Sequence, residues 1–582
     1  MPAAGICRVA ILAMLHVCTA TVPVFAQEPR AFLAGIVRGQ RGEPIAEALV
    51  SFAPSNVGIR TDSRGRFRLA VAPAVSGTIS VVASGFAPAT MSVQSPSSGE
   101  TRDITVILIP LARLDAVTVV ASSGRPLLNT EDAATGGSID RREIAALPTD
   151  ARDPIALLYN IPGIAPATGF FGDAPRLSFN GGNSLYSQYL LDGLDNNEGF
   201  LGGPRVDIPL GAIARMDAHV NTYSARFGRS PDGVVDVASL AGSARWTGDA
   251  YVYQRPGRPL DAKAVVPFGA NREAVHRRQE GFRRFQGGGA VSGPLRANHS
   301  FASAAVEYTR EEEDRIGSTA LAQFLGTETR QSWKALTRLD HGWSNTQTTT
   351  LRLAGSAVDR AGNGSGVVTP EADISTRRVG SLTAITHRSA LWGLRASNTA
   401  SVQYGTFHWY FPPSRSNFSL PQVTVITPAF ETRAVVGSSN FVFDERERQW
   451  QVRNVLETAL GERHTLRLGG DIIAGQFTLF AAATNPNGAY VVYDDGNIPA
   501  PEGRPLSITD IPADVRVESY TVDARPQQVN LSQNLYGAFL EDTWRPTHAV
   551  TVVAGFRWDY DDLTSHGASQ ADLNNIQPRF SI

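Results

Sequence analysis

Hydrophobic and polar residues alternate along most of the chain beyond residue 245, in runs that Gly, Asn and Pro interrupt. In one such run Val550, Val552 and Phe556 share a face, whereas Arg557 and Asp559 share the opposite face. Because successive side chains of a strand point to opposite faces, this period of two predicts strands and not helices. Five hairpins are expected, at residues 282–312, 331–356, 381–411, 452–480 and 535–560.

Short and long connections alternate between these strands. RANHS at 296–300 and RPTH at 545–548 are short, whereas 256–281 and 481–529 are long. An apolar row beside a charged row, with short periplasmic turns and long extracellular loops, is typical of an outer-membrane barrel. A soluble sandwich also alternates, but it seldom pairs every short turn with a long loop at the opposite end.

This topology predicts where two clusters of side chains lie. The aromatic stretch FHWYF, residues 407–411, would form part of a girdle near the outer interface, and ordinary packing between strands is the alternative. The acidic run 311–314 would lie on an extracellular loop, where it either solvates that loop or attracts cations.

The first residues predict export. Arg8 precedes the apolar segment VAILAMLHVCTATVPVFA, which closes in a small-residue cleavage site before Gln27, so residues 1–26 are expected to be a signal peptide. A membrane anchor is the alternative, but the uninterrupted apolar part is shorter than the about 20 residues that span a bilayer. Both cysteines, Cys7 and Cys18, lie in this segment, which excludes thiolate and zinc–thiolate sites from the mature chain.

Shorter alternating runs separated by turns predict a small β-sandwich at residues 27–111. Its spacing pattern is Gly35-x-Val37, Gly42-x-Pro44, Ala48-x-Val50 and Thr61-Asp62-x-x-Gly65-x-Phe67. In these residues the segment resembles the carboxypeptidase regulatory-like domain, which implies an immunoglobulin-like accessory module and no peptidase. A zinc peptidase is further disfavoured because the chain has no HExxH motif.

Residues 125–244 begin with signals for two short helices. Asp140 and Glu143 are spaced as a capping box, and Asp153 before Pro154 is spaced to cap a second helix. The remainder of this segment resembles the plug domain of TonB-dependent receptors, in the residues Gly181, Gly182, Asn183, Tyr189, Asp192, Gly193, Arg226, Gly228 and Arg229. That resemblance implies that Arg226 and Arg229 face carboxylates of a barrel wall, and that Gly228 and Gly233 allow a tight strand pair. Asp232, Asp236 and Ala238 depart from the usual pattern and put the register of the last plug strand in doubt.

A β-prone run lies between the sandwich and the plug, in residues 112–124. An isolated strand of this kind is suited to joining the sheet of another protein, although many such runs are only linkers. The run resembles the TonB box of the same receptors at Leu114, Asp115, Val117, Thr118, Val119 and Val120. The resemblance implies pairing with the periplasmic TonB protein.

The acidic stretch YLLDGLDNNEG raises the question of a metal loop. Calcium loops of the EF-hand type need oxygen ligands at alternate positions and a glycine at the sixth, and neither the register from Asp192 nor that from Asp195 supplies them. Residues 188–191 are instead expected to form a plug strand that Asp192 and Gly193 turn. Asn196 and Asn197 would begin an exposed loop and bond their own backbone. No metal ligand is therefore assigned.

Composition excludes other classes. The net charge of -2 gives no reason to expect nucleic acid, and the ten histidines are scattered singly without a catalytic set or a GxxxxGK loop. The chain is therefore expected to be no enzyme and to hold no cofactor.

The predicted fold class is mainly β: an Ig-like sandwich, an α+β plug and a partial antiparallel transmembrane barrel in residues 245–582. About eleven strands and the start of a twelfth are counted, against about 22 in plugged transporters. A C-terminally truncated product is therefore expected, the alternative being a complete small barrel.

The expected function is TonB-dependent uptake of a small extracellular ligand (siderophore, carbohydrate or peptide) across the outer membrane of a Gram-negative bacterium. By the resemblance the subgroup is Oar-like, and the partners are the TonB–ExbB–ExbD complex and outer-membrane lipid. A surface or adhesion protein that imports nothing, or a non-functional fragment, are the alternatives.

Overall fold

The structure is a computed structural model. It describes residues 31–39, 42–53, 57–83, 86, 89–108, 135–147, 149–167, 177–221, 224–230, 232–257, 281–297, 299–391, 396–414, 418–461, 463–482, 484–523, 527–547, 549–565 and 573–582. The chain divides into two compact units, residues 1–111 and 112–582. The predicted signal peptide lies outside the described residues.

The first unit is a sandwich of two sheets. One has the order β4-β1-β7, formed by Arg66–Val71, Ala31–Gly39 and Thr101–Leu108. The other has the order β3-β2-β5-β6, formed by Val57–Arg60, Leu49–Ala53, Ser76–Val82 and Ala89–Gln94. Alternate apolar residues such as Leu33, Val50, Leu69 and Ile79 fill the core between them. The predicted Ig-like sandwich is confirmed.

The second unit contains the plug, whose main sheet has the order β12-β11-β14-β13-β8. These strands are Leu194–Asp195, Gln188–Leu191, Val234–Ser239, Ile213–His219 and Gly136–Asp140, and a separate pair joins β9 (Ile164–Pro166) to β10 (Leu177–Phe179). The short helical segments are α1 (Arg141–Ala146), η1 (Asp150–Arg152), α2 (Pro154–Leu157), η2 (Leu158–Asn160), η3 (Ser184–Tyr186) and η4 (Leu210–Ala212).

Both predicted helix caps are present. Asp140 accepts hydrogen bonds from the backbone of Arg142 and Glu143, and Glu143 accepts one from the backbone of Asp140. Asp153 accepts one from the backbone of Ile155, which turns Leu157 and Leu158 into the plug core. The register of β14 is also settled, because it pairs parallel with β11 and antiparallel with β13.

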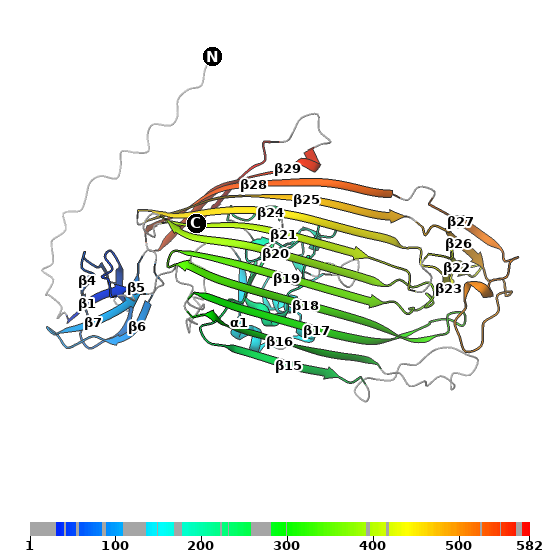
Figure 1. Ribbon diagram of the computed structural model, residues 1–582, viewed down its shortest axis with the longest axis horizontal. Coiled ribbons are helices and arrows are strands. Elements are labelled where there is room, and N and C mark those ends of the chain that lie inside the picture. Colours follow the sequence, from blue (N-terminus) through cyan, green and yellow to red (C-terminus); the bar gives the residue numbers. More distant parts are fainter. Residues whose placement is uncertain are drawn as a thin grey trace, which may run out of the picture. The chain divides into compact units, whose positions relative to one another are not determined.

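A twelve-stranded antiparallel sheet curves around the plug (Figure 1). Its strands, in spatial order, are β15 (Thr247–Arg255), β16 (Phe282–Arg296), β17 (Ser300–Ile316), β18 (Leu325–Ser344), β19 (Gln347–Ala361), β20 (Thr376–Leu391), β21 (Ala396–Tyr410), β24 (Val442–Leu460), β25 (His464–Ala482), β28 (Gln527–Thr547), β29 (Val550–Asp561) and β30 (Ile576–Ser581). The count agrees with the predicted eleven strands and a twelfth, and all five predicted hairpins are present.

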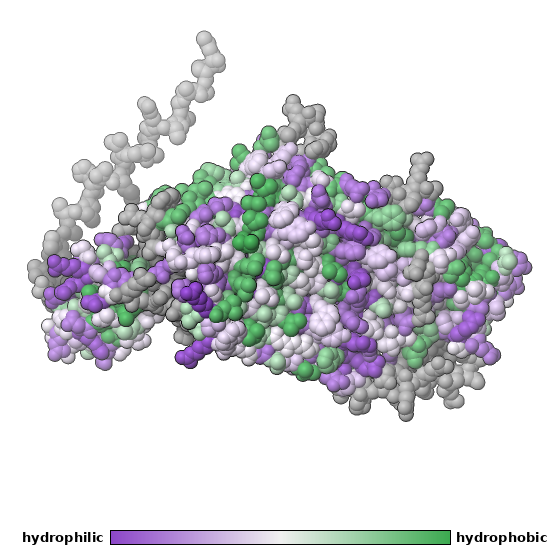
Figure 2. All heavy atoms as spheres, viewed as in Figure 1, coloured by the Kyte–Doolittle hydropathy of each residue, from purple (hydrophilic) through white to green (hydrophobic). Residues whose placement is uncertain are grey.

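The two faces of this sheet differ as the alternation predicts. Phe556 is 55% exposed on the outer face, whereas its neighbour Arg557 is 3% exposed on the inner face. Figure 2 shows many hydrophobic residues on the outward face of the strands. In the described part of the chain no helix is both long and apolar enough to span a membrane.

One long connection is more structured than the sequence suggested. Residues 481–529, expected to be a loop, contain β26 (Ala489–Tyr493), η6 (Ile508–Asp510) and β27 (Val517–Thr521). These strands join β22 (Gln422–Ile426) and β23 (Thr432–Gly437) in a four-stranded sheet of order β23-β22-β26-β27. Its own apolar cluster, including Val425, Val436 and Val492, explains why the segment folds. A short helix, α3 (Asp562–Ser565), follows β29.

Two other expectations for the long-loop end are wrong. The acidic run 311–314 lies within strand β17, where Glu311 accepts from Arg284 and Glu312 pairs with Arg283. Phe407, Trp409 and Phe411 do not form a girdle, because all three are at most 2% exposed and pack inward with Leu201 and Phe443. The alternative, ordinary packing, holds for this aromatic cluster.

Candidate functional site

The plug turn at Asp192 is bound to the barrel wall. Asp192 and Gly193 both have positive φ angles, 53° and 76°, which lets β11 reverse into β12 within two residues. The carboxylate accepts hydrogen bonds of 2.7 Å from the backbone and hydroxyl of Ser239 in β14 and of 2.8 Å from Arg352 in β19. The Arg352 guanidinium also donates to the carbonyl of Leu191 and to Gln403.

The carboxylate of Asp192 and the guanidinium of Arg352 have opposite charges. Burial by itself raises the pKa of Asp192. The guanidinium groups of Arg352 and Arg338 and the bond from Ser239 together lower the pKa by more than burial raises it, so it lies below its ordinary value. Arg352 is only 2% exposed. The predicted plug turn is therefore also the place where a charged plug residue meets a charged wall residue.

The next acidic residue, Asp195, meets neutral partners. Its backbone N–H donates to Gln451 of β24 at 2.9 Å, and its carboxylate accepts from Gln449 at 3.1 Å. Burial raises the pKa of Asp195 above its ordinary value, against the opposing charge of Arg205 and the bond from Gln449. The predicted interpretation of both aspartates as turn and lumen groups agrees with these contacts.

The loop that follows is not exposed at its start, contrary to the expectation for Asn196 and Asn197. Asn196 is 4% exposed, and its amide bonds the backbone of Val206 in both directions. Asn197 donates to the carbonyls of Ser187 and Gly202 and accepts from the backbone of Tyr189, which is itself buried. The side chains do bond nearby backbone, but they close a compact loop against the plug.

The other glycine-rich signature lies at a tight turn between β10 and η3. Asn180 and Gly181 have positive φ angles, and Asn183 caps η3 by accepting from the backbone of Leu185. A Cβ on Gly182 would lie 2.7 Å from the carboxylate of Asp232. Gly182 therefore makes room for Asp232, one of the residues that departs from the family pattern.

The two arginines of the signature at residues 226–229 have different partners. Arg229 pairs with Asp471 of β25 and lies 3.7 Å from Asp559 of β29, as the resemblance implied. Arg226 is exposed and stacks its guanidinium 4.4 Å above the ring of Phe227, so the expectation of a barrel carboxylate is wrong for it.

Gly228 and Gly233 were expected to allow a tight strand pair; the carbonyl of Gly233 accepts a hydrogen bond from the backbone of Gln188, next to the β11–β14 pairing. A Cβ on Gly228 would overlap the guanidinium of Arg557, an inward side chain of β29. A Cβ on Gly233 would overlap the ring of Phe179. Each glycine therefore makes room for one large side chain.

Three buried glutamates form a cluster that the sequence interpretation did not include. Glu198 comes from the plug loop, and Glu445 and Glu447 come from β24. Arg205 of the same plug loop approaches Glu447 with 2.8 Å between Nη1 and Oε2. Burial first, and the charge of Glu447 second, raise the pKa of Glu198 above its ordinary value.

A weak signal for these residues exists in the sequence. Positions 445, 447, 449, 451 and 453 read Glu, Glu, Gln, Gln and Arg, which is an all-polar row at the period of a strand. Such a row predicts a wall that faces a polar plug. The predicted TonB box, residues 114–120, lies outside the described residues, so its role stays a prediction.

Comparisons with known proteins agree with this geometry. Residues 316–580 match the model of an outer membrane beta barrel domain, and residues 33–108 match the carboxypeptidase regulatory-like domain. Over 241 residues the chain is 23% identical to the TonB-dependent transporter Oar of Myxococcus xanthus, which covers 40% of this chain and 22% of that protein.

Solved structures share the fold. The outer membrane transporter YddB of Escherichia coli superposes with a TM-score of 0.56 at 14% identity, covering 76% of this chain and 58% of that chain. A mutant ferric enterobactin receptor of Pseudomonas aeruginosa in complex with enterobactin superposes with a TM-score of 0.50 at 15% identity, covering 78% and 60%. The chain thus spans less than two thirds of the length of each of these relatives.

Proposed function

Since the chain is an outer-membrane protein of the TonB-dependent receptor type, we propose that it takes up a small extracellular ligand by an energy-coupled movement of its plug. The ligand class is a siderophore, a carbohydrate or a peptide. The observation that carries the proposal is the way in which the plug is held inside the curved sheet. Ion pairs join plug side chains to inward side chains of the strands, among them Asp150–Arg284, Arg152–Glu307, Asp192–Arg352, Arg205–Glu447, Asp207–Arg378 and Arg229–Asp471.

These contacts make spontaneous opening costly. Removing one partner of a buried pair by substitution typically costs about 3–5 kcal/mol, because the other charge is left buried and unpaired, and an opening that separates a pair before water reaches it has a cost of this kind. A ligand that passes through the lumen needs several such contacts to break together, so an external source of work is required. Force applied by TonB at residues 114–120, directly before the plug, would supply it.

The contacts are also suited to reform. They are non-covalent: hydrogen bonds, ion pairs and apolar contacts, the last including Leu336 and Leu382 of the wall in the plug core and Leu201 of the plug against Phe407. A plug held in this way returns to the same position after it moves. A surface protein that imports nothing has no need of such a reversible seal, and the uptake experiment described next separates the two roles.

The test is uptake by cells that make the protein with residues 114–120 deleted. Labelled ferric siderophores, oligosaccharides and peptides are offered, and both surface binding and accumulation are measured. The unaltered protein should accumulate one of them and lose accumulation, but not binding, when an uncoupler collapses the proton gradient.

Cells that make the deletion variant should bind the ligand without accumulating it, as the uncoupled cells do, while the variant still reaches the outer membrane. A deletion of equal length at residues 121–127 is the matched control and should retain accumulation. Accumulation that survives loss of residues 114–120 would refute energy coupling through this segment. Binding without any accumulation in the unaltered protein would favour a surface or adhesion role.

A further inference from the structure

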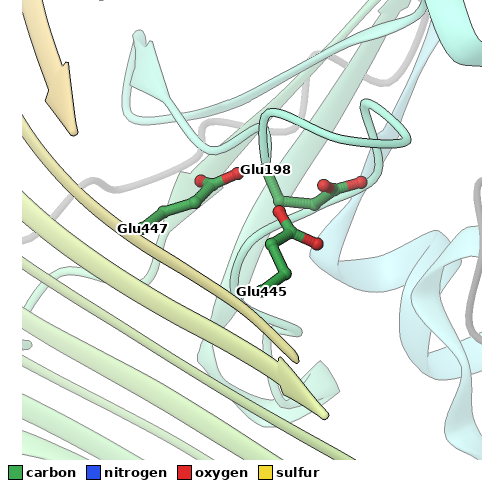
Figure 3. Close-up of side chains that lie close together, drawn as sticks. All are labelled: Glu198, Glu445 and Glu447. Carbon is green, nitrogen blue, oxygen red and sulfur yellow. The ribbon is translucent and has the colours of Figure 1, made fainter. Parts of the chain in front are cut away.

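The cluster of Glu198, Glu445 and Glu447 joins the plug to the barrel wall. Glu445 and Glu447 are two residues apart on β24 and therefore project from the same face, toward the plug loop that carries Glu198 (Figure 3). One carboxylate oxygen from each residue lies within 4.8 Å of the other two. The three residues are 2%, 0% and 6% exposed, so bulk water does not separate their charges.

Two of the three carboxylates are held in place by other groups. Glu198 accepts hydrogen bonds from the backbone N–H groups of Phe200, Leu201 and Gly203, which wrap the loop around it. Glu447 accepts a 2.5 Å hydrogen bond from the backbone of Gly199, besides its ion pair with Arg205. Their positions are thus fixed by the loop and are not accidents of side-chain rotation.

Glu445 is different. It is fully buried, and neither of its carboxylate oxygens has a hydrogen-bond partner among the described residues. A buried ionised carboxylate without a partner costs several kcal/mol, so a group of this kind needs a proton or a cation. One of its oxygens lies within 4.8 Å of an oxygen of Glu198 and of one of Glu447, so a cation there would contact all three residues.

The charges favour a divalent cation. Three ionised carboxylates carry three negative charges, and Arg205, which also faces the buried carboxylate of Asp195, supplies one positive charge beside Glu447, so negative charge remains in excess. The ligands are all oxygens, which suit Ca²⁺, Mg²⁺ and Mn²⁺ more than metals that prefer nitrogen or sulfur. Opposite ligands of Ca²⁺ are about 4.6–5.2 Å apart, since each lies about 2.3–2.6 Å from the ion. Oxygens within 4.8 Å of one another can therefore be ligands of one ion.

We propose that Glu198, Glu445 and Glu447 bind one Ca²⁺ ion that connects the plug loop to strand β24. Glu445 offers both oxygens, Glu198 and Glu447 each offer at least one, and water completes the six to eight ligands that Ca²⁺ takes. Glu198 and Glu447, two of the three glutamates, also line a cavity of about 350 Å³ that has room for the waters of the ion.

The bound ion fixes the plug loop against the wall at one point. With Ca²⁺ present, Glu198 and β24 are held together through the ion; without it, Glu198 faces two like-charged side chains, and contacts such as those of Arg205 and Gly199 with Glu447 hold the loop. Calcium therefore stabilises the closed position of this loop. The inference does not depend on uptake, because binding and loop protection are measured on the protein at rest.

The test uses the full chain, purified in detergent and stripped with a chelator. Titration with CaCl₂ in a calorimeter should show one saturable site, and Ca²⁺ should slow amide exchange in residues 198–206. Glu445→Gln removes one charge at almost constant shape and should weaken Ca²⁺ binding by about tenfold or more.

Glu307→Gln is the matched control. Glu307 is also a buried inward glutamate that contacts the plug, but Arg152 and Lys334 already neutralise it. The control should bind Ca²⁺ as the unaltered protein does. If Glu445→Gln does not fold, metal analysis of the unaltered protein after dialysis against Ca²⁺ decides, because the proposal requires one ion per chain.

Two results would overturn the proposal. One is the absence of saturable Ca²⁺ binding by the folded, unaltered protein, which would mean that Glu445 carries a proton. The other is equal weakening by Glu307→Gln and Glu445→Gln, which would place the ion elsewhere. Neither result bears on the uptake experiment, which fails or succeeds on accumulation alone.

Discussion

The pair between Asp192 and Arg352 gives the sharpest test of how the plug is held. Asp192→Asn keeps the shape of the side chain and the acceptor for the Ser239 backbone, but it removes the charge. The Arg352 guanidinium, 2% exposed, then faces an uncharged amide at the position of a carboxylate oxygen now 2.8 Å away. Its remaining partners are Gln403 and the carbonyl of Leu191.

The geometry sets the expected magnitude. Leaving one member of a buried pair without its partner costs about 3–5 kcal/mol. Because Gln403 and the carbonyl still solvate Arg352, we expect the lower end, about 3 kcal/mol. Each 1.4 kcal/mol is about tenfold in an equilibrium constant, so local opening of the β11–β12 turn should become about a hundredfold more frequent.

Hydrogen exchange read by mass spectrometry measures this opening in peptides that cover residues 188–195 and 234–239. Asp217→Asn is the matched control: Asp217 lies in the same plug sheet and pairs with Arg215, whose side chain is 57% exposed. An exposed pair is worth at most about 1 kcal/mol, so exchange should rise by less than about fivefold.

Equal exchange in Asp192→Asn and Asp217→Asn would refute the reasoning, because it would mean that the buried pair does not hold the turn. A double variant, Asp192→Asn with Arg352→Met, gives a second reading. Removing both charges should cost less than the sum of the two single changes, since neither charge is left alone.

Three further outcomes are expected. A Cβ at Gly211 would lie 3.7 Å from that of Ala305, close to the Cβ–Cβ distance of about 3.8 Å in disulfides. The oxidised double variant Gly211→Cys with Ala305→Cys should therefore block accumulation of the ligand, and a reductant should restore it. Each single variant should accumulate the ligand in both conditions. Gly35→Ala should lower the calorimetric melting midpoint of the sandwich, at a cost of about 1–3 kcal/mol, because its Cβ would overlap the backbone carbonyl of Ile104 in β7. Bonding to Arg504 lowers the pKa of Asp510 to about 2; the contribution of this pair is complete above pH 4 and disappears as pH falls through 2. Because Arg504 is half exposed, amide exchange at residues 507–511, corrected for its intrinsic pH dependence, should rise by less than about fivefold between pH 4 and pH 2.

The fold was predictable where one face of a strand is apolar. Val550, Val552 and Phe556 mark β29 without ambiguity, because their alternation has no helical counterpart. Strand β24 was expected to begin at Val452, but it begins at Val442. Its first half, DERERQWQ, has charged or polar residues on both faces near the long-loop end, so no apolar row marked it.

The candidate site was predictable on the plug side and not on the wall side. Asp192 and Gly193 combine an acidic residue with a turn glycine, which is a local signal. Arg352 lies 160 residues away and is one arginine in the run TTTLRLAGS. Only the neighbouring Leu351 and Leu353, on the opposite face, indicate that Arg352 points inward, and nothing local indicates which plug residue it meets.

Many charges of the inner wall and the plug are complementary, and this explains why an exception has consequences. Glu307 meets Arg152 and Lys334, and Arg378 meets Asp207, so those charges are balanced inside the protein. Desolvation makes each unbalanced charge costly, which favours sequences that pair them. Glu445 is buried as deeply as these residues and has no such partner among the described residues. Glu445→Gln would remove the cost of burying an unpaired charge in a single substitution, so a glutamate at this place requires a partner from outside the chain. That partner is a proton or a Ca²⁺ ion. The two differ in one measurable respect, because only the ion makes the contact between plug loop and wall depend on calcium concentration.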